Sequence, residues 1–201
     1  MKARLAVALV IGLSATGWPA AAARPTLDES WRQCAGGDAD GSVRGCTAVI
    51  RSGKEKGASL AAAYYNRGTA YYHQLLGDRA IQEPGDHDAG RASPIDLAIG
   101  DFGEAIRLQP DHAAAFVNRG IAYYDKGQYD RAIQDYDQAI RLKPDLAEAF
   151  NNRSLAYYKK AQYERATQDF DQTIRLNKNY GNALINRALG PSEAQAGQKS
   201  R

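Results

Sequence analysis

Apolar and small residues recur every three or four positions along the middle of the chain, which is the spacing of one face of an α-helix. The pattern is clearest in two blocks, at residues 113–125 and 129–142. The polar sequence Lys126-Gly127-Gln128 between them is typical of a turn. Two helices joined by a short turn form an antiparallel hairpin, so the pattern predicts an all-α chain built from helical hairpins.

The same hairpin recurs at a fixed period. The sequence NRGIAYY, which begins at Asn118, has close copies beginning at Asn66 and Asn152 and a shorter copy, NRAL, beginning at Asn186. The last three of these asparagines are 34 residues apart (118, 152, 186), and such a period is typical of a stacked repeat array. The first spacing is 52 residues (66 to 118), so the first unit contains an insertion of 18 residues.

These patterns divide the chain into segments. We expect a signal peptide at 1–23, a degenerate helical hairpin at 24–60, repeat units at 61–110, 113–146 and 147–180, a capping helix at 181–190 and a disordered tail at 191–201. The insertion is expected at about 75–93, inside the first unit. Asp111 and Asp145 each follow a proline and are predicted to cap the next helix. Ser93-Pro94 is predicted to restart the helix after the insertion.

The residues at equivalent places in the units resemble the signature of the tetratricopeptide repeat family, which combines large aromatic, small, tyrosine, alanine and proline positions. In the unit 113–146 these places hold Phe116, Gly120, Tyr123, Ala132, Tyr136, Ala139 and Pro144. In the next unit they hold Phe150, Ser154, Tyr157, Ala166, Phe170, Thr173 and Lys178, and in the first Tyr64, Gly68, Tyr71, Ala98, Phe102, Ala105 and Pro110. The resemblance implies the family's fold, a right-handed superhelical array of antiparallel helical hairpins (a TPR solenoid).

The N-terminus has the features of a secretory signal peptide. Lys2 and Arg4 precede an apolar run at 5–18, and small residues follow it, so cleavage is expected after Ala22 or Ala23. The run is shorter than the roughly 20 residues that span a bilayer. We therefore expect an exported protein of the bacterial periplasm without stable membrane insertion. Its charge would be +1 rather than the +3 of the full chain, which does not indicate nucleic-acid binding.

Cys34 and Cys46 are the only cysteines in the sequence. An exported protein meets oxidising conditions, which favour a disulfide between them. A redox pair or a metal site fits less well, because the spacing is not CxxC and no histidine is near. We predict that the disulfide joins the two short helices expected at 28–35 and 42–52.

The resemblance also implies where a ligand would bind, because the first helix of each unit in this family lines a concave groove. Residues three and four apart on that helix share a face. In the three units this face should hold Ala62, Tyr65, Asn66, Thr69, Tyr72 and His73; Ala114, Val117, Asn118, Ile121, Tyr124 and Asp125; and Glu148, Asn151, Asn152, Leu155, Tyr158 and Lys159. Asn182, Ile185 and Asn186 would extend it.

Each unit thus offers one asparagine to the same line of the groove: Asn66, Asn118, Asn152 and Asn186. A primary amide both donates and accepts hydrogen bonds, so a row of amides can hold a peptide backbone, similar to the asparagine ladders of peptide-binding family members. The tyrosines of the face favour apolar or aromatic ligand side chains. The alternative is that one ancestral unit was copied and that the amides bond between neighbouring helices. Family members that clamp carboxylates use Lys and Arg here, so no such clamp is expected.

A second repeated pattern pairs cations with acids. Arg67, Arg119, Arg153 and Arg187 stand where the family usually has leucine, near the seam between helices. An unpaired cation would be costly there. Each complete unit also places an acid on its second helix, namely Asp101, Asp135 and Asp169. We predict Arg–Asp pairs along the seam.

No catalytic motif is present, so we expect no enzymatic activity and no cofactor. The predicted function is a protein–protein interaction module that binds an extended peptide or protein segment, accessory to envelope assembly or secretion. One alternative is a self-associating scaffold, a homo-oligomer. A second is a metal-binding or enzymatic role for the insertion, which carries Asp86, His87 and Asp88, with His73 upstream.

Overall fold

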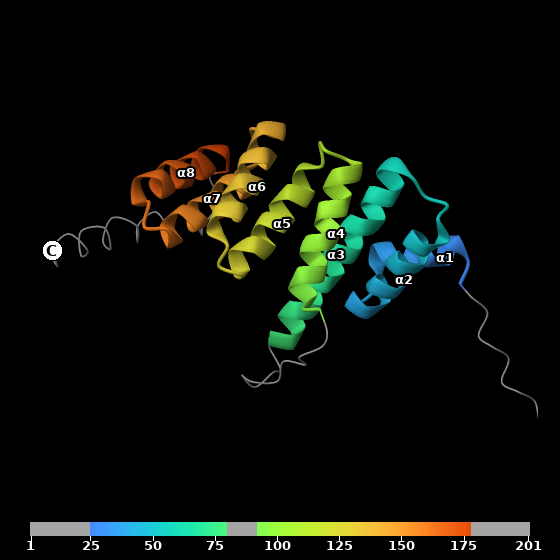
Figure 1. The fold of residues 1–201 in the computed structure, drawn as a ribbon. Helices are drawn as coiled ribbons and strands as arrows, with labels where there is room; N and C mark the ends of the chain where they lie inside the picture. Colours follow the sequence, from blue (N-terminus) through green and yellow to red (C-terminus); the bar gives the residue numbers. More distant parts are fainter. Residues whose placement is uncertain (1–24, 80–91, 178–201) are drawn as a thin grey trace, which may run out of the picture.

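The computed structural model describes residues 25–79 and 92–177, which form eight α-helices (Figure 1). These are α1 (Leu27–Gly36), α2 (Ala39–Ser52), α3 (Gly57–Arg79), α4 (Pro94–Leu108), α5 (Ala113–Asp125), α6 (Tyr129–Leu142), α7 (Ala147–Lys159) and α8 (Tyr163–Leu176). No strand occurs among these residues. The expected signal peptide, the capping helix, the C-terminal tail and the residues Asp86, His87, Asp88, Asn186 and Arg187 lie outside the described part.

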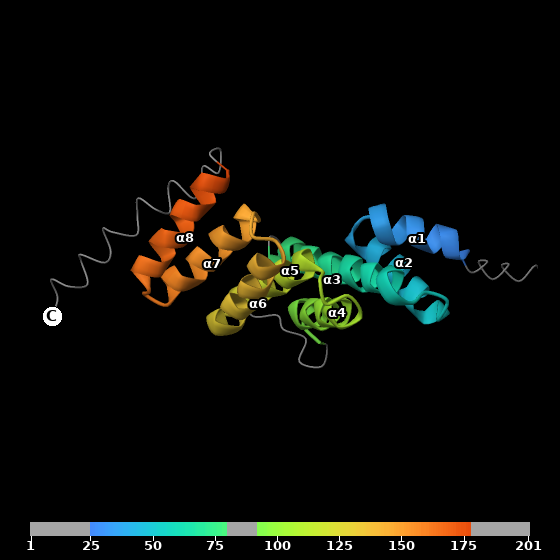
Figure 2. The same cartoon turned by 90° about the horizontal axis from the view of Figure 1, so that it is seen from above.

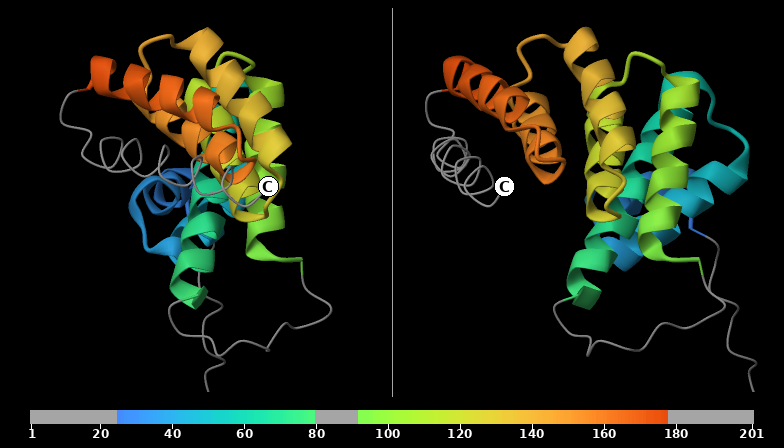
Figure 3. Two further views of the ribbon diagram at one scale, coloured as in Figure 1. Left: turned by 90° about the vertical axis from the view of Figure 1, so that its left-hand side faces the viewer. Right: turned by 60° about the vertical axis from the view of Figure 1, so that its left-hand side comes forward.

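The helices pair in chain order into four hairpins, α1–α2, α3–α4, α5–α6 and α7–α8. The second helix of each hairpin also packs on the first helix of the next, so the hairpins follow one another from α1–α2 to α7–α8 (Figure 1). Seen from above, α4 and α6 lie along one side of α3 and α5 (Figure 2). Successive hairpins are turned relative to one another (Figure 3). The predicted all-α solenoid of helical hairpins is confirmed.

The predicted helices at 113–125 and 129–142 coincide with α5 and α6. Two other boundaries differ from expectation. Helix α3 continues through Leu75 to Arg79, so the start of the expected insertion is helical. Helix α2 begins at Ala39 because the Asp38 side chain accepts a hydrogen bond from the Gly41 N–H and caps the helix earlier than predicted.

The predicted helix caps are only partly correct. Asp111 and Asp145 cap no helix: the N-cap residues are His112 for α5 and Leu146 for α7. His112 Nδ1 accepts a hydrogen bond from the Ala115 N–H at 3.3 Å, so the imidazole replaces the expected carboxylate. Ser93 is the N-cap of α4, with proline in the first turn as predicted, although its hydroxyl makes no capping bond.

Small residues allow the two helices of a hairpin to approach closely. A Cβ atom added at Gly68 would lie 2.9 Å from Phe102 Cε1, and one added at Gly120 would lie 2.6 Å from Tyr136 Cε1. Neither distance is tolerated by a well-packed core. The aromatic ring of the second helix therefore occupies the space that glycine leaves on the first.

The leading hairpin carries the disulfide. Cys34 of α1 and Cys46 of α2 lie with their sulfur atoms 2.07 Å apart, and both residues are buried. They pack with Val49 and with Ala63 of α3. The bridge thus lies where the hairpin meets the first repeat unit.

Candidate functional site

The described asparagines of the predicted ladder lie half-buried on successive first helices, with Asn66 on α3, Asn118 on α5 and Asn152 on α7. Asn118 Nδ2 donates to the Tyr65 hydroxyl at 3.1 Å, and Asn66 Nδ2 points to Cys34 Sγ at 3.9 Å. Both contacts reach the preceding hairpin. Bonding between neighbouring helices, which was the alternative to ligand binding, is therefore present at these two positions.

These contacts use only part of each amide. A primary amide has two N–H donors and one oxygen acceptor. The contacts of Asn66 and Asn118 each use one N–H, while Asn152 Oδ1 accepts from Asn151 Nδ2 at 3.3 Å. The row therefore keeps hydrogen-bonding capacity for a ligand.

The tyrosines of the same face combine packing with partial exposure. The Tyr72 hydroxyl donates to Asp125 Oδ2 at 2.7 Å, which links α3 to α5. Tyr124 packs on Tyr129 with ring centroids 5.4 Å apart, as Tyr158 does on Tyr163 at 5.5 Å. Burial raises the pKa of Tyr124, so its hydroxyl stays neutral. Tyr65, Tyr72, Tyr124 and Tyr158 are all half-buried rather than fully enclosed.

Two residues that spacing placed on this face are buried instead. Val117 is 2% exposed and packs with Ala139 and Ala149, while Asn151 is 6% exposed. Val117 lies where Ala139 of α6 and Ala149 of α7 close over α5. Only Tyr65, the equivalent residue in the first unit, stays half-buried. The accessible face is therefore narrower than predicted.

The predicted Arg–Asp pairs are present in all three described units. Each guanidinium makes two hydrogen bonds to one carboxylate: Arg67 to Asp101 at 2.7 and 2.8 Å, Arg119 to Asp135 at 2.8 and 2.7 Å, and Arg153 to Asp169 at 2.7 and 2.7 Å. The bonds to the carboxylates raise the pKa values of Arg67 and Arg119. These cations are thus committed to the seam and do not serve ligand binding.

Two of the arginines also reach back to the preceding hairpin. Arg153 Nη1 donates to Asp137 at 2.6 Å, and Arg67 Nη1 donates to Thr47 at 3.2 Å. Arg119 faces Gly103 instead, and a Cβ atom added there would lie 3.7 Å from Arg119 Nη1. The sequence contains this difference between units, because Gly103 and Asp137 are one period apart. The packing was needed to recognise that the position faces the arginine of the next hairpin.

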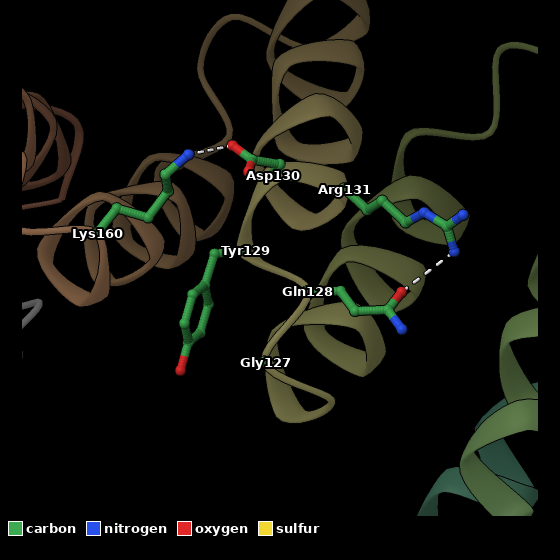
Figure 4. A pocket seen from close by; sticks show the side chains of 6 residues that line it. All are labelled: Gly127, Gln128, Tyr129, Asp130, Arg131 and Lys160. Carbon is green, nitrogen blue, oxygen red and sulfur yellow. Dashed lines mark hydrogen bonds and ion pairs between the residues drawn. The ribbon is translucent and has the colours of Figure 1, made fainter.

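One pocket of about 330 Å³ lies beside the turn between α5 and α6 (Figure 4). Its polar groups are paired with one another, since Lys160 bonds to Asp130 and Arg131 donates to Gln128. Tyr129 and Gly127 complete the lining. The paired charges favour a stabilising role for these groups, so this pocket is not our candidate site.

A larger pocket, of about 410 Å³, lies between the leading hairpin and α3. Its lining consists of Cys34, Ala35, Gly37, Ala39, Ser42, Tyr65, Asn66, Thr69, Ala70 and His73. The pocket brings the ladder residues Tyr65 and Asn66 together with the disulfide. This pocket could not be predicted from the sequence, because the repeat pattern does not indicate how the leading hairpin packs on α3.

Over the described ranges, no helix is long and apolar enough to cross a membrane. Within the same part of the chain, no three His, Cys, Asp or Glu side chains gather as metal ligands. The predicted metal alternative rests on Asp86, His87 and Asp88, which fall outside those ranges.

Solved structures resemble this fold at low sequence identity. A crystal structure of MamA aligns with a TM-score of 0.66 and 18% identity, over 85% of this chain and 85% of that chain. The first TPR of Spaghetti (RPAP3) bound to an HSP90 peptide aligns with a TM-score of 0.58 and 20% identity, over 71% and 98%. The second TPR domain of human RPAP3, in complex with an HSP70 peptide, gives 0.55 and 21%, over 65% and 94%.

Family models match the sequence itself. One described as TPR repeat matches residues 122–160, and two described as tetratricopeptide repeat match residues 102–134 and 146–179. No curated protein matches the chain. The matches cover the end of α4 and the hairpins α5–α6 and α7–α8, with Gly120 and the Arg119–Asp135 and Arg153–Asp169 pairs. Residues 102–179 are therefore tetratricopeptide repeats.

Proposed function

We propose that the face formed by α3, α5 and α7 binds an extended peptide or protein segment without catalysing a reaction. The observation that carries the proposal is the row of Asn66, Asn118 and Asn152, half-buried at the same position on three successive first helices. A peptide backbone presents N–H and C=O groups at regular intervals, which amides can bind in either direction. Two structures of similar fold, both from RPAP3, are described as bound to chaperone peptides, which supports peptide binding.

The ligand that fits this face is apolar or aromatic rather than acidic. The cations of the repeats, such as Arg119 and Arg153, are held by Asp135 and Asp169 at the seam. Half-buried tyrosines offer flat surfaces to apolar side chains. Because neutral amides and phenols contribute little charge-assisted energy, we expect modest affinity.

The proposal also concerns the cellular compartment in which the protein acts. The signal-peptide features at 1–23 favour export, and the close sulfur atoms of Cys34 and Cys46 suit an oxidising compartment. We propose a periplasmic accessory to envelope assembly or secretion. Detection of the mature chain in a periplasmic fraction of the native bacterium, cleaved after Ala22 or Ala23, would test this part, and an uncleaved cytoplasmic chain would refute it.

Peptide selection tests the groove itself. Random dodecapeptides displayed on phage would be selected on the mature protein, and the enriched peptides titrated by fluorescence anisotropy. We expect replacement of Asn66, Asn118 and Asn152 together by alanine to weaken binding at least tenfold. The matched control replaces Gln134 and Gln168, exposed amides on α6 and α8, by alanine and should bind as the wild type does.

Two results would count against the groove. Equal binding by the asparagine and glutamine variants would refute the amide row, provided that circular dichroism shows both variants folded. Failure to enrich any peptide would refute peptide binding as such. Light scattering on the same samples would reveal a self-associating scaffold as a rise of mass with concentration.

A further inference from the structure

We propose that the pocket between the leading hairpin and α3 binds one uncharged side chain, aromatic or leucine-like, of the peptide held by the groove. The inference rests on the proposed function, since it names the anchor of that ligand. We call it the hairpin pocket; its residues are the ten that line the 410 Å³ cavity. The first of the three family-model matches begins at residue 102, so none of them covers a residue of this pocket.

The size and the small apolar residues of the wall suit a single apolar group, while Ser42, Asn66, Thr69 and His73 form the polar part of the wall. A volume of about 410 Å³ lies at the lower end of the range for ligand pockets. The walls carry Ala35 and Ala39 from the leading hairpin, and Ala70 and Tyr65 from α3. An aromatic side chain inserted there would bury apolar surface on both sides, which is the main source of affinity for such anchors.

Charge argues against an ionic occupant. No Lys, Arg, Asp or Glu lines the hairpin pocket, and His73 is the one wall residue that can become a cation, so a charged side chain meets no fixed opposite charge in the wall itself. Asp38 and Asp40 lie beside it at the start of α2, where Asp38 caps the helix and Asp40 accepts from Gln74. Their negative charge further disfavours an acidic side chain.

Two of the polar wall groups, the Ser42 and Thr69 hydroxyls, are already bonded within the protein, while Asn66 keeps hydrogen-bonding capacity for the peptide backbone. The Ser42 hydroxyl lies 3.3 Å from the carbonyl oxygens of both Gln33 and Gly37, and the Thr69 hydroxyl donates to the Tyr65 carbonyl at 3.0 Å. A neutral side chain therefore enters without breaking the hydrogen bonds of these two hydroxyls. The disulfide of Cys34 holds one wall, which makes the cavity preorganised.

The hairpin pocket shares two residues with the groove. Asn66 points to Cys34 Sγ from the pocket wall, and the Tyr65 hydroxyl accepts from Asn118 on α5. A peptide backbone lying on the amide row thus passes the pocket at the row's first member. A side chain projecting from that end reaches the cavity.

Capped amino acids test the pocket without knowledge of the natural peptide. The N-acetyl amides of phenylalanine, leucine, lysine and glutamate would be titrated into ¹⁵N-labelled mature protein and followed by ¹H–¹⁵N correlation spectra. We expect saturable shifts at Ala39, Thr69 and Ala70 with the phenylalanine and leucine amides. Shifts that are absent with all four probes, or larger with a charged probe, would overturn the proposal.

Filling the cavity provides the matched comparison. Thr69→Phe should weaken phenylalanine-amide binding at least tenfold, and Ala35→Phe, at an exposed position of α1, should do the same if Thr69→Phe perturbs the fold. The control is Thr167→Phe on α8, because Thr167 donates to its own helix at 3.0 Å just as Thr69 does but lies outside the hairpin pocket. Equal binding by Thr69→Phe and Thr167→Phe, both folded, would refute the pocket.

The two proposals fail separately. Phage-selected peptides that bind the wild type and Thr69→Phe equally would leave the groove intact and exclude the hairpin pocket. A phenylalanine amide that binds the pocket while no peptide is enriched would support the pocket and exclude peptide binding by the groove.

Discussion

Replacing Gly103 by aspartate should stabilise the repeat array. The substitution would supply the acid that Asp137 provides one period later, where it accepts from Arg153 Nη1 at 2.6 Å. A Cβ atom at position 103 would be 3.7 Å from Arg119 Nη1, an ordinary contact distance. The carboxylate can therefore reach the guanidinium without moving the backbone of α4.

The expected gain is about 1 kcal/mol. Aspartate is favoured over glycine in a helix interior by roughly 0.3 kcal/mol. The reference pair shows side-chain exposures of 18% for Arg153 and 42% for Asp137, so solvent screens the pair and its contribution is about 0.5–1 kcal/mol. For a domain of this size, 1 kcal/mol raises Tm by about 2–4 °C.

The assay is thermal unfolding followed by circular dichroism at low and high salt. Gly103→Asn is the matched control, since asparagine has nearly the shape of aspartate without its charge. We expect Gly103→Asp to exceed Gly103→Asn in Tm by about 2 °C at low salt, and by less in 0.5 M NaCl because salt screens partly exposed pairs. Equal Tm values for the two variants at low salt would refute the idea that Arg119, already paired with Asp135, can gain a second acidic partner on the preceding hairpin.

Three further outcomes follow from the packing. Gly120→Ala should lower the free energy of unfolding in urea by about 1–3 kcal/mol, because the added Cβ would lie 2.6 Å from the Tyr136 ring. Gly100→Ala, whose added Cβ would have nothing within 4 Å, should raise it by about 0.5–1 kcal/mol. Reduction of Cys34–Cys46 should cost about 3 kcal/mol of the free energy of unfolding, and a dithiothreitol-insensitive urea midpoint would contradict this. Burial lowers the pKa of His112 below 6.5, so the stabilisation by neutral His112 is present above pH 6.5 and is lost as pH falls through the lower folded pKa. In His112→Asn the decrease of Tm between about pH 7 and pH 5 should therefore be smaller than in the wild type. An unchanged dependence of Tm on pH would contradict this.

Several features of the candidate site were readable from sequence. The amide row followed from period and spacing alone, because a residue repeated at 34-residue intervals must take the same place in each hairpin. The seam pairs followed from a physical constraint, since Arg119 could not be enclosed without a partner and Asp135 was within reach. Both depend on local geometry that every unit shares.

Other features depended on how hairpins meet. Helical spacing placed Val117 and Asn118 side by side on one face, yet Val117 is enclosed by Ala139 and Ala149 while Asn118 stays half-buried. Spacing defines an angle around a helix but not how far a neighbour covers it. The capping of α5 by His112 rather than Asp111 likewise depends on the path of the turn before the helix.

The helices, their pairing into hairpins, the disulfide partners and the Arg–Asp seam were predictable from the sequence, because each arises from a repeated local pattern or from the pairing of few candidates. Only the tertiary structure decided the width of the groove and the existence of the hairpin pocket. The leading hairpin does not share the 34-residue period, so its contact with α3 depends on the shapes of Cys34, Tyr65 and their neighbours. Such complementarity between different surfaces is a property of packing, which no periodicity encodes.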